Sequence, residues 1–182
     1  FLRTGFTYHI DSENDFGISA MGAFGKNESN SQIFYHHLNQ AMDTTQNRVR
    51  TTGNEGYMGF YNVSADYKHI FKKDTEEITA NFSYFGGLGN NDNNYHNWSK
   101  IGDDITEKTD YQTSWNNSNN FSLQTDYYNK FTKDSKFEVG IKAEYKTNDS
   151  EDRSFDENKN EDLSQYNPFK YTEQIYAAYA SY

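Results

Sequence analysis

Apolar and polar residues alternate along most of this chain, which is the period of a β-strand with two different faces. Residues 61–68 read Tyr-Asn-Val-Ser-Ala-Asp-Tyr-Lys, so every second side chain is apolar. A charged stretch, KKDTE, follows at 72–76, and the alternation resumes over 78–84. The pattern predicts a β-hairpin with one apolar and one polar face.

The same period continues through the chain, whereas a helical period is weak even at its best position, 34–42. We therefore expect an all-β fold, an antiparallel up-and-down meander of about seven long strands, as a single segment over residues 1–182. The expected strands are 1–10, 16–39, 57–71, 77–98, 112–131, 136–148 or beyond, and 169–182.

Two kinds of connection alternate between these strands. The short ones are charged and turn-like, and the long ones are rich in Asn, Asp, Ser and Thr. Every second connection of a meander lies at the same end of the sheet, so tight turns are expected at one end and long polar excursions at the other. The short connections are 11–15, 72–76 and 132–136, and the long ones lie within 25–56, 86–115 and 147–167.

One face of the predicted sheet is apolar and the other is polar. Tyr and Phe stand towards the ends of the apolar runs, as in the aromatic girdles of transmembrane barrels. The expected lipid-facing residues are Tyr61, Val63, Ala65, Tyr67, Ile78, Ala80, Phe82, Tyr84, Phe121, Leu123, Tyr127, Phe137, Val139, Ile141 and Tyr145. The expected lumen-facing residues are Asn62, Asp66, Lys68, Asn81, Gln124, Asp126, Glu138, Lys142 and Glu144.

Alternation alone also fits a soluble sheet with one face in a protein core. Three features favour lipid instead. The apolar face extends over about 9–11 residues per strand, the length that a tilted strand needs to cross a bilayer. The aromatic residues form girdles, and short turns at one end oppose long connections at the other. These features predict part of a transmembrane β-barrel in the cell outer membrane.

The composition excludes several other classes. There are 17 Lys and Arg residues against 27 Asp and Glu residues, so no basic surface for nucleic acid is expected. An aromatic content of 18% distinguishes the chain from a disordered one. The absence of Cys excludes disulfides, thiolate metal sites and Cys nucleophiles. The sequence shows neither a signal-peptide pattern nor an apolar run of 18 residues.

Candidate chemistry is sparse. No catalytic spacing or phosphate-binding loop stands out, so neither an enzyme nor a cofactor is expected. His36 and His37 are adjacent and would point to opposite faces of a strand, so they cannot share a metal, and no metal site is expected. The Asn- and Asp-rich stretches 89–98 and 149–162 offer oxygen ligands of the kind that Ca²⁺ prefers. Neither matches an EF-hand loop, and solvated outer loops are favoured.

Three aromatic residues, Tyr95, Trp98 and Trp115, are the candidates for ligand contact in a long polar connection. Rings beside Asn and Asp can stack on a sugar or a peptide and hydrogen-bond to it. The favoured alternative assigns the Trp residues to the aromatic girdle at the outer interface. Charged residues on the polar face are expected mainly to pair across strands and fix the register.

Three segments resemble successive hairpins of the outer-membrane β-barrel family, and in particular the barrel region of TonB-dependent receptor-like proteins common in Bacteroidota. The most specific pieces are the Asp-Tyr pairs at 66–67 and 126–127 and the closing pattern F-x-Y-x-E-x-I-x-A-A-Y over 169–179. The resemblance covers most of the chain. The segments are GFYNVSADYKHIFKKDTEEITANFSY, NFSLQTDYYNKFTKDSKFEVGIKAEYKTND and FKYTEQIYAAYASY.

The resemblance implies a 22-stranded barrel with an N-terminal plug domain inside it, which imports a ligand with energy transmitted by TonB. The chain departs from this pattern in having about seven strands, no plug domain and no TonB-contact segment. An odd strand number and two open edges do not suit a complete barrel in lipid. We therefore expect an internal piece of a larger barrel. The implied partners are outer-membrane lipid, the remainder of the barrel with its plug, and the TonB system or surface lipoproteins.

Two other interpretations stay open. The open edges fit a barrel piece captured as a client of assembly machinery or as a component of a surface complex. Alternatively, the chain is a soluble all-β glycan-binding module, in which Val63, Phe82, Leu123 and Ile141 are buried together against a second sheet.

Overall fold

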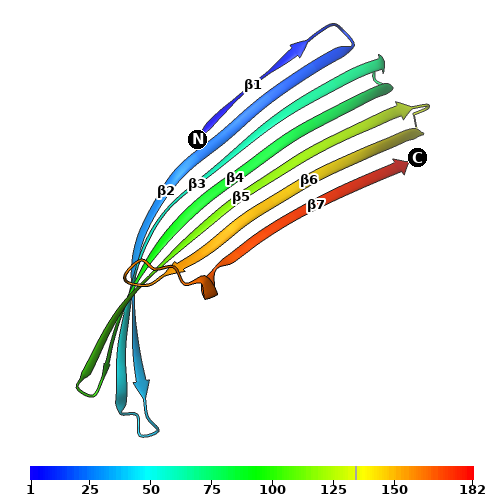
Figure 1. The fold of residues 1–182 in the computed structure, drawn as a ribbon. Coiled ribbons are helices and arrows are strands. Elements are labelled where there is room, and N and C mark those ends of the chain that lie inside the picture. Colours follow the sequence, from blue (N-terminus) through cyan, green and yellow to red (C-terminus); the bar gives the residue numbers. More distant parts are fainter. Residues whose placement is uncertain (134) are drawn as a thin grey trace.

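The computed structural model describes residues 1–133 and 135–182. They form one antiparallel sheet in which the strands pair in chain order, as the sequence predicts (Figure 1). No helix of the described residues is long and apolar enough to cross a bilayer. The strands are β1 (Leu2–His9), β2 (Asn14–Leu38), β3 (Thr44–Lys72), β4 (Glu76–Ile101), β5 (Asp104–Lys130), β6 (Lys136–Phe155) and β7 (Asn167–Ser181), and a 3₁₀ turn, η1 (Leu163–Gln165), precedes β7.

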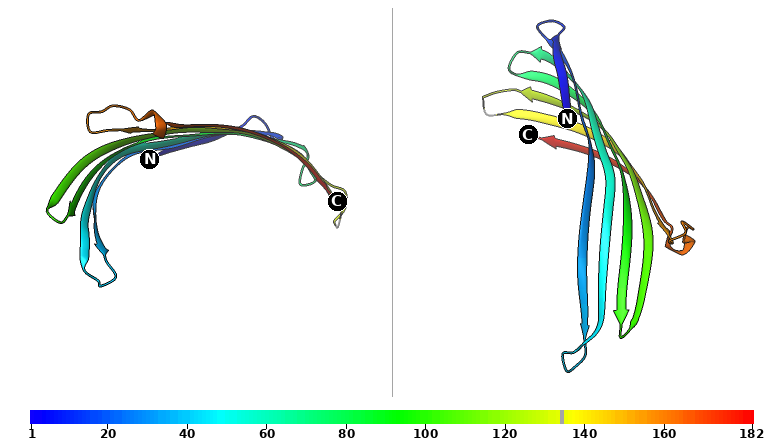
Figure 2. Two further views of the ribbon diagram at one scale, coloured as in Figure 1. Left: turned by 60° about the horizontal axis from the view of Figure 1, so that its bottom comes forward. Right: turned by 90° about the vertical axis from the view of Figure 1, so that its left-hand side faces the viewer.

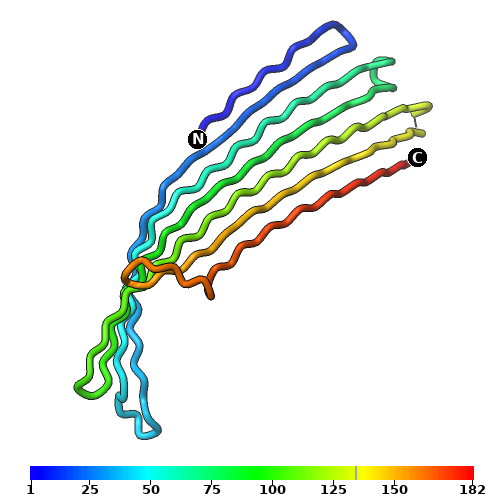
Figure 3. Tube along the Cα trace, in the orientation of Figure 1, coloured from blue at the N-terminus to red at the C-terminus, as the bar shows by residue number. Residues whose placement is uncertain are grey.

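Two of the three long polar connections are mostly strand rather than loop, so the prediction was wrong for 44–56, 99–101 and 104–111, which lay between the expected strands. β2 and β3 continue outward as a paired hairpin that turns near residues 39–43, and β4 and β5 do the same around residues 102–103. Both hairpins run past the ends of β6 and β7 (Figure 3). In the third connection β6 continues to Phe155, and an irregular loop follows.

Polar side chains bonded across the strands explain why Asn-rich sequence forms these extensions. Asn54 Nδ2 lies 2.7 Å from Asn91 Oδ1 and 2.8 Å from Asn93 Oδ1. Arg50 Nε donates to Asn97 Oδ1 at 2.8 Å. Such ladders let residues of low intrinsic β-propensity pair, because that propensity depends strongly on cross-strand neighbours.

Two of the three short connections, 11–15 and 72–76, are tight turns, as predicted. In the first, the side chain of Asp11 accepts from the backbone N–H of Glu13 and from Asn14 Nδ2, each at 2.8 Å. In the second, Asp74 has a left-handed φ of 60°, and Thr75 N–H donates to the Lys72 carbonyl at 3.1 Å. The third expected turn, 132–136, includes position 134, which lies outside the described residues.

The sheet is a single bowed layer without a core (Figure 2). Within the described ranges no hydrophobic side chain is buried; Phe82 is 40%, Leu123 52% and Ile141 61% exposed. The described residues therefore do not bury these side chains together, as the alternative of a soluble sandwich required. A stable domain needs a second layer over an apolar face, so something beyond the described residues must cover this one.

Both edges of the sheet are open within the described residues. β1 pairs with β2 only as far as Gly22, so from Ala23 onward β2 has no partner on that side. β7 pairs with β6 alone. Unpaired backbone groups at these edges need further strands or another cover.

Candidate lipid-facing wall and outer pocket

Backbone pairing aligns the predicted apolar residues in rows across the sheet. The register of each strand pair shifts only near the ends, at His37/Leu38 and Ile70/Lys72. All residues expected to face lipid therefore share one face, and all residues expected to face a lumen share the other. One apolar row contains Phe6, Ile18, Ala65, Phe82, Leu123, Ala143 and Tyr176.

Aromatic rings contact each other along the apolar face. The Tyr84 and Phe121 rings stack with centroids 4.3 Å apart, and Tyr61 meets Tyr84 edge to face at 5.5 Å. The Tyr61 and Tyr84 hydroxyls are 2.9 Å apart, and Tyr84 donates to Asn119 Oδ1 at 2.7 Å. This chain of bonded hydroxyls satisfies the polar ends of rings that are otherwise apolar.

The outer limit of the apolar face is oblique to these rows. On β3 apolar or glycine residues continue to Tyr57, whereas on β5 they stop at Phe121. Beyond Phe121 the same face of β5 carries Asn119 and Asn117. An oblique limit is expected where tilted strands cross a flat layer, because a line parallel to that layer meets successive strands at shifted registers.

The opposite face is dominated by hydroxyl, amide and charged groups. The Ser19 and Ser64 hydroxyls are 2.8 Å apart across β2 and β3. Lys142 and Lys146 both contact the Glu144 carboxylate, at 2.6 and 3.1 Å. The serine pair joins two strands and supports their register. Both Lys–Glu contacts lie within β6, so they do not set register, and with their lysines partly exposed they add little to stability.

One apolar cluster on the polar face was missed from the sequence. The Phe60 and Phe85 rings stack with centroids 6.3 Å apart, and Met58 lies on the same face. Gly87 pairs with Phe60, which places a residue without a side chain beside the rings. The cluster lies outward of the serine row that crosses this face.

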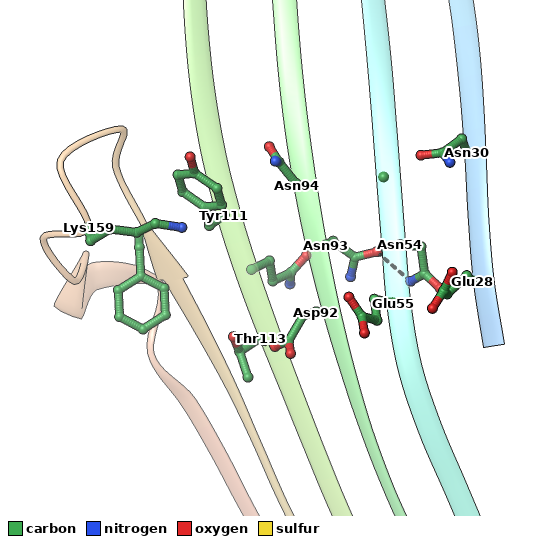
Figure 4. Close-up of a pocket in the computed structure, with 13 residues that line it drawn as sticks. Glu28, Asn30, Asn54, Glu55, Asp92, Asn93, Asn94, Tyr111, Thr113 and Lys159 are labelled. Atoms are coloured by element: carbon green, nitrogen blue, oxygen red, sulfur yellow. Dashed lines mark hydrogen bonds between the residues drawn. The ribbon is translucent and has the colours of Figure 1, made fainter. Parts of the chain in front are cut away.

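A pocket of about 670 Å³ lies farther out along the strands (Figure 4). Residues of two rows on the apolar side of the sheet form most of the pocket lining. Lys159, from the loop after β6, places its ammonium group over the ring of Tyr111. The inner row is Glu28, Glu55, Asp92 and Thr113, and the outer row is Asn30, Gly53, Asn94, Tyr111 and Phe155.

The carboxylates of the inner row are bonded to neighbouring groups. Lys26 Nζ is 2.6 Å from both Glu28 Oε1 and Glu55 Oε1. Hydrogen bonds from Lys26 lower the pKa of Glu28 and, in return, those carboxylates raise the pKa of Lys26 above its ordinary value. Thr113 Oγ1 donates to Asp92 Oδ1 at 2.8 Å. The lowered pKa keeps the Glu28 carboxylate ionised at neutral pH.

The loop after β6 shows which side of the bowed sheet carries this pocket. The Arg153 guanidinium lies 5.4 Å from the centroid of the Tyr166 ring, and the Tyr166 hydroxyl donates to Glu151 Oε2 at 3.1 Å. Both β6 residues share the face of Ile141. The loop lies on the convex side of the sheet (Figure 2, left). The apolar face and the pocket therefore belong to the convex side.

Asp156 organises the start of that loop. Asn160 Nδ2 donates to Asp156 Oδ2 at 3.0 Å, and the backbone N–H groups of Asn158 and Asn160 donate to Oδ1 at 2.9 and 2.8 Å. The bond from the Asn160 side chain, followed by those backbone bonds, lowers the pKa of Asp156 below its ordinary value.

The stability of this loop is expected to depend on pH. Because the folded-state pKa of Asp156 is below the unfolded value of about 3.9, its stabilising effect is complete above that pH and is lost as pH falls through the folded pKa. In an acid titration followed by NMR, the Asn158 and Asn160 amide resonances should shift with a midpoint below about 3.9. Asn160→Ala should raise the midpoint. A midpoint at or above the ordinary value in the unsubstituted protein would contradict the prediction.

The structure separates the three aromatic residues considered for ligand contact. Trp115 and Trp98 lie on the apolar side, with Trp98 farther out and paired with Val49. Tyr95 lies on the opposite face, where the guanidinium carbon of Arg50 is 5.5 Å from its ring centroid. The carboxylate row was missed because only the register between strands shows that Glu28, Glu55 and Asp92 meet.

Metal binding gains no support from this geometry. Among the described residues no group of three or more His, Asp or Glu side chains is arranged to hold an ion. His36 is bonded to Asn47, with its Nδ1 2.6 Å from Asn47 Oδ1.

The model of the outer membrane protein beta-barrel family matches residues 69–182, which is more than half of the chain. The chain belongs to this family. Membership supports the outer-membrane location predicted from the sequence. It also accounts for a sheet with an uncovered apolar face and unpaired edges, because barrel strands face lipid and pair with further barrel strands.

Among solved structures, the chain shows a weak similarity to the ferric yersiniabactin uptake receptor FyuA from Yersinia pestis. It is 9% identical, with a TM-score of 0.25, and the match covers 93% of this chain and 32% of the receptor chain. This outer membrane β-barrel chain thus spans about a third of the receptor, and the similarity is too weak to carry a functional argument. No curated protein sequence matches the chain.

Proposed function

We propose that this chain forms part of the wall of a large outer-membrane transporter of the TonB-dependent type. In this proposal the convex apolar face contacts lipid, and the concave polar face lines a lumen that holds water or a plug domain. The β2–β3 and β4–β5 hairpins extend from the outer surface of the membrane. The edges of β1 and β7 pair with other strands of the same barrel.

The uncovered apolar face carries the proposal. Its residues are aligned in rows over all seven strands, yet side chains such as Leu123 and Ile141 remain more than half exposed. Burying an apolar side chain of this size is worth about 1.5–3 kcal/mol, so many exposed ones would make a water-soluble form of this sheet unstable. A lipid environment supplies the missing cover.

The height of the apolar face also supports a membrane span. On β3 it runs from Tyr67 to Tyr57, ten positions along one strand. At a rise of ~3.3 Å per residue and a tilt of 35–45°, this corresponds to roughly 23–27 Å along the membrane normal. The apolar band of an outer-membrane barrel is about 25 Å tall.

The transporter class is supported by the size and polarity of the implied barrel. Seven strands do not close on themselves, so a barrel that contains them is larger than this chain. Small barrels fill their interior with side chains, and larger ones enclose water or a plug. A concave face of Ser, Asn, Asp and Lys suits the second case, and the sequence resemblance points to TonB-dependent receptors among large barrels.

Single cysteines at neighbouring positions test the orientation of the wall. The 182 residues contain no Cys, so Ile141→Cys and Lys142→Cys can be introduced on opposite faces. In the intact protein in outer membranes, a lipid-soluble maleimide should label the first, and a water-soluble one should label only the second. Equal labelling of both by the water-soluble reagent would overturn the wall assignment. Ligand uptake that persists without TonB would overturn only the transporter class.

A further inference from the structure

A cluster of cationic side chains lies on the concave face of the β2–β3 and β4–β5 hairpins. Arg48 and Arg50 have the same facing as Asn62 on their strand, because the pairing of β3 with β4 is continuous between these positions. Lys108 stands in the row of Arg50, with Asn97 between them. Both hairpins bend toward the concave side (Figure 2, left). In the proposed barrel these cations therefore stand at the outer mouth of the lumen.

The two arginines and Lys108 line one cavity of about 380 Å³, together with amide and hydroxyl side chains. This volume lies within the usual range for small-ligand sites of about 300–1,000 Å³. Asp110 is the acidic residue of the described lining, and its Oδ1 is 2.8 Å from Lys108 Nζ. The cavity therefore keeps an excess of positive charge from the arginines, although the whole chain has a formal net charge of -10.

Each guanidinium group of the cavity is held against a tyrosine ring. The guanidinium carbon lies 5.7 Å from the ring centroid of Tyr35 for Arg48, and 5.5 Å from that of Tyr95 for Arg50. Contact with a ring occupies a face of the planar guanidinium and leaves the N–H groups at its edge available. Arg50 donates from Nε to Asn97 Oδ1 at 2.8 Å, and no described residue accepts a bond from its terminal nitrogens. The cavity thus holds oriented donors with unused capacity.

A second observation is that neither guanidinium group is neutralised. Among the described residues no Asp or Glu forms an ion pair with Arg48 or Arg50. On the convex side, by contrast, Arg153 contacts the Glu151 carboxylate. Two like charges two residues apart on the same face of a strand repel each other, and an anion held between them would replace this repulsion by attraction.

We propose that this cavity binds a carboxylate or phosphate group of a soluble substrate at the outer mouth of the lumen. The inference rests on the proposed function and adds the substrate class, an anionic solute. Arg48 and Arg50 donate from the edges of their guanidinium groups to the anionic oxygens, a geometry that planar oxyanions match. Asn97 and the two tyrosines are positioning residues, because they hold the guanidinium groups. The positive potential of the cavity also raises the local concentration of anions.

Titration calorimetry of the intact protein in a non-ionic detergent tests this, with succinate and inorganic phosphate as probes at low ionic strength. Arg48→Gln and Arg50→Gln should each weaken binding about tenfold or more, because each removes charge-assisted hydrogen bonds. Arg50→Lys should weaken binding by less, since lysine keeps the charge but not the planar fork; it also covers the case in which Arg50→Gln fails to fold. Arg153→Gln is the matched control, because Arg153 lies on the opposite face; its affinity should be unchanged.

Further probes identify the anion and its source. Binding of succinate alone assigns a carboxylate and binding of phosphate alone assigns a phosphate, and either result supports the proposal. Succinamide, the neutral analogue of succinate, should not bind, and phosphatidylglycerol in mixed micelles should not compete. The proposal is overturned if neither anion binds, if succinamide binds equally well, if phosphatidylglycerol displaces the anion, or if both glutamine variants keep the full affinity. The labelling of Ile141→Cys and Lys142→Cys, repeated in the arginine variants, shows whether the wall assignment stands where this inference fails.

Discussion

Leu123→Arg is expected to destabilise the membrane-inserted protein by about 2–4 kcal/mol, the cost of an arginine at the bilayer midplane on the lipid side of a barrel. Leu123 lies in the middle of the apolar face, between Phe82 and Ala143 in its row, and is 52% exposed. No acidic residue stands in that row to pair with the new charge. The folded fraction in lipid, measured by urea titration, should fall accordingly.

Gln124→Arg is the control for this substitution. Gln124 is the next residue of β5 and points to the opposite face, between Asn81 and Lys142 in its row. Its side chain already donates to Asp126 Oδ2 at 2.8 Å, so an arginine there finds a carboxylate and polar surroundings. Folding should be affected little. Equal losses from both substitutions would show that the two faces do not differ in environment, and the proposed lipid contact would fail.

Gly56→Ala is expected to destabilise the outer part of the β3–β4 pair by about 1–3 kcal/mol, as for other overpacked sites. A Cβ at this position would stand 2.7 Å from the backbone carbonyl oxygen of Asn90 and 2.7 Å from Asn91 Oδ1. The side chain of Asn91 can move, but the carbonyl oxygen belongs to the paired backbone. The adjacent strand must therefore shift for the methyl group to fit.

Gly89→Ala provides the comparison, since its Cβ would meet only the Tyr57 carbonyl oxygen, at 3.8 Å. Replacing Gly by Ala in extended backbone restricts the unfolded chain, so this change should be neutral or stabilising by up to about 1 kcal/mol. Limited proteolysis of the β2–β3 hairpin in the intact inserted protein measures both effects. Faster cleavage in Gly56→Ala and unchanged or slower cleavage in Gly89→Ala are expected. Faster cleavage in both would exclude the backbone contact as the cause.

Much of the fold is visible in the sequence because the side-chain period of a strand is two. Once Tyr61, Val63 and Ala65 are assigned to one face, Asn62 and Asp66 must point to the opposite face. The turn at 72–76 could be located for a similar local reason, because its charged residues interrupt an apolar run. These features depend only on neighbours within one strand or one turn.

The polar hairpins and the pocket could not be found in this way. The sequence around Asn54 has the composition of a loop, and its strand character comes from pairing with Asn91 and Asn93, which are distant along the chain. Likewise, Glu28, Glu55 and Asp92 form one row only because three strands pair in a particular register. In the hairpins, side-chain pairing across strands outweighed local propensity. In the pocket, the register between strands brought the carboxylates together.

The sequence by itself determined the strand order, the two unlike faces and the class of membrane protein, since alternation and turn chemistry are local properties of the chain. Only the tertiary structure decided how far the strands extend, that the apolar face is the convex one, and that its outer limit runs obliquely across the strands. It also placed a polar pocket of about 670 Å³ on the convex side. These features arise from register and curvature, which are set by contacts between strands and are not encoded within any one of them.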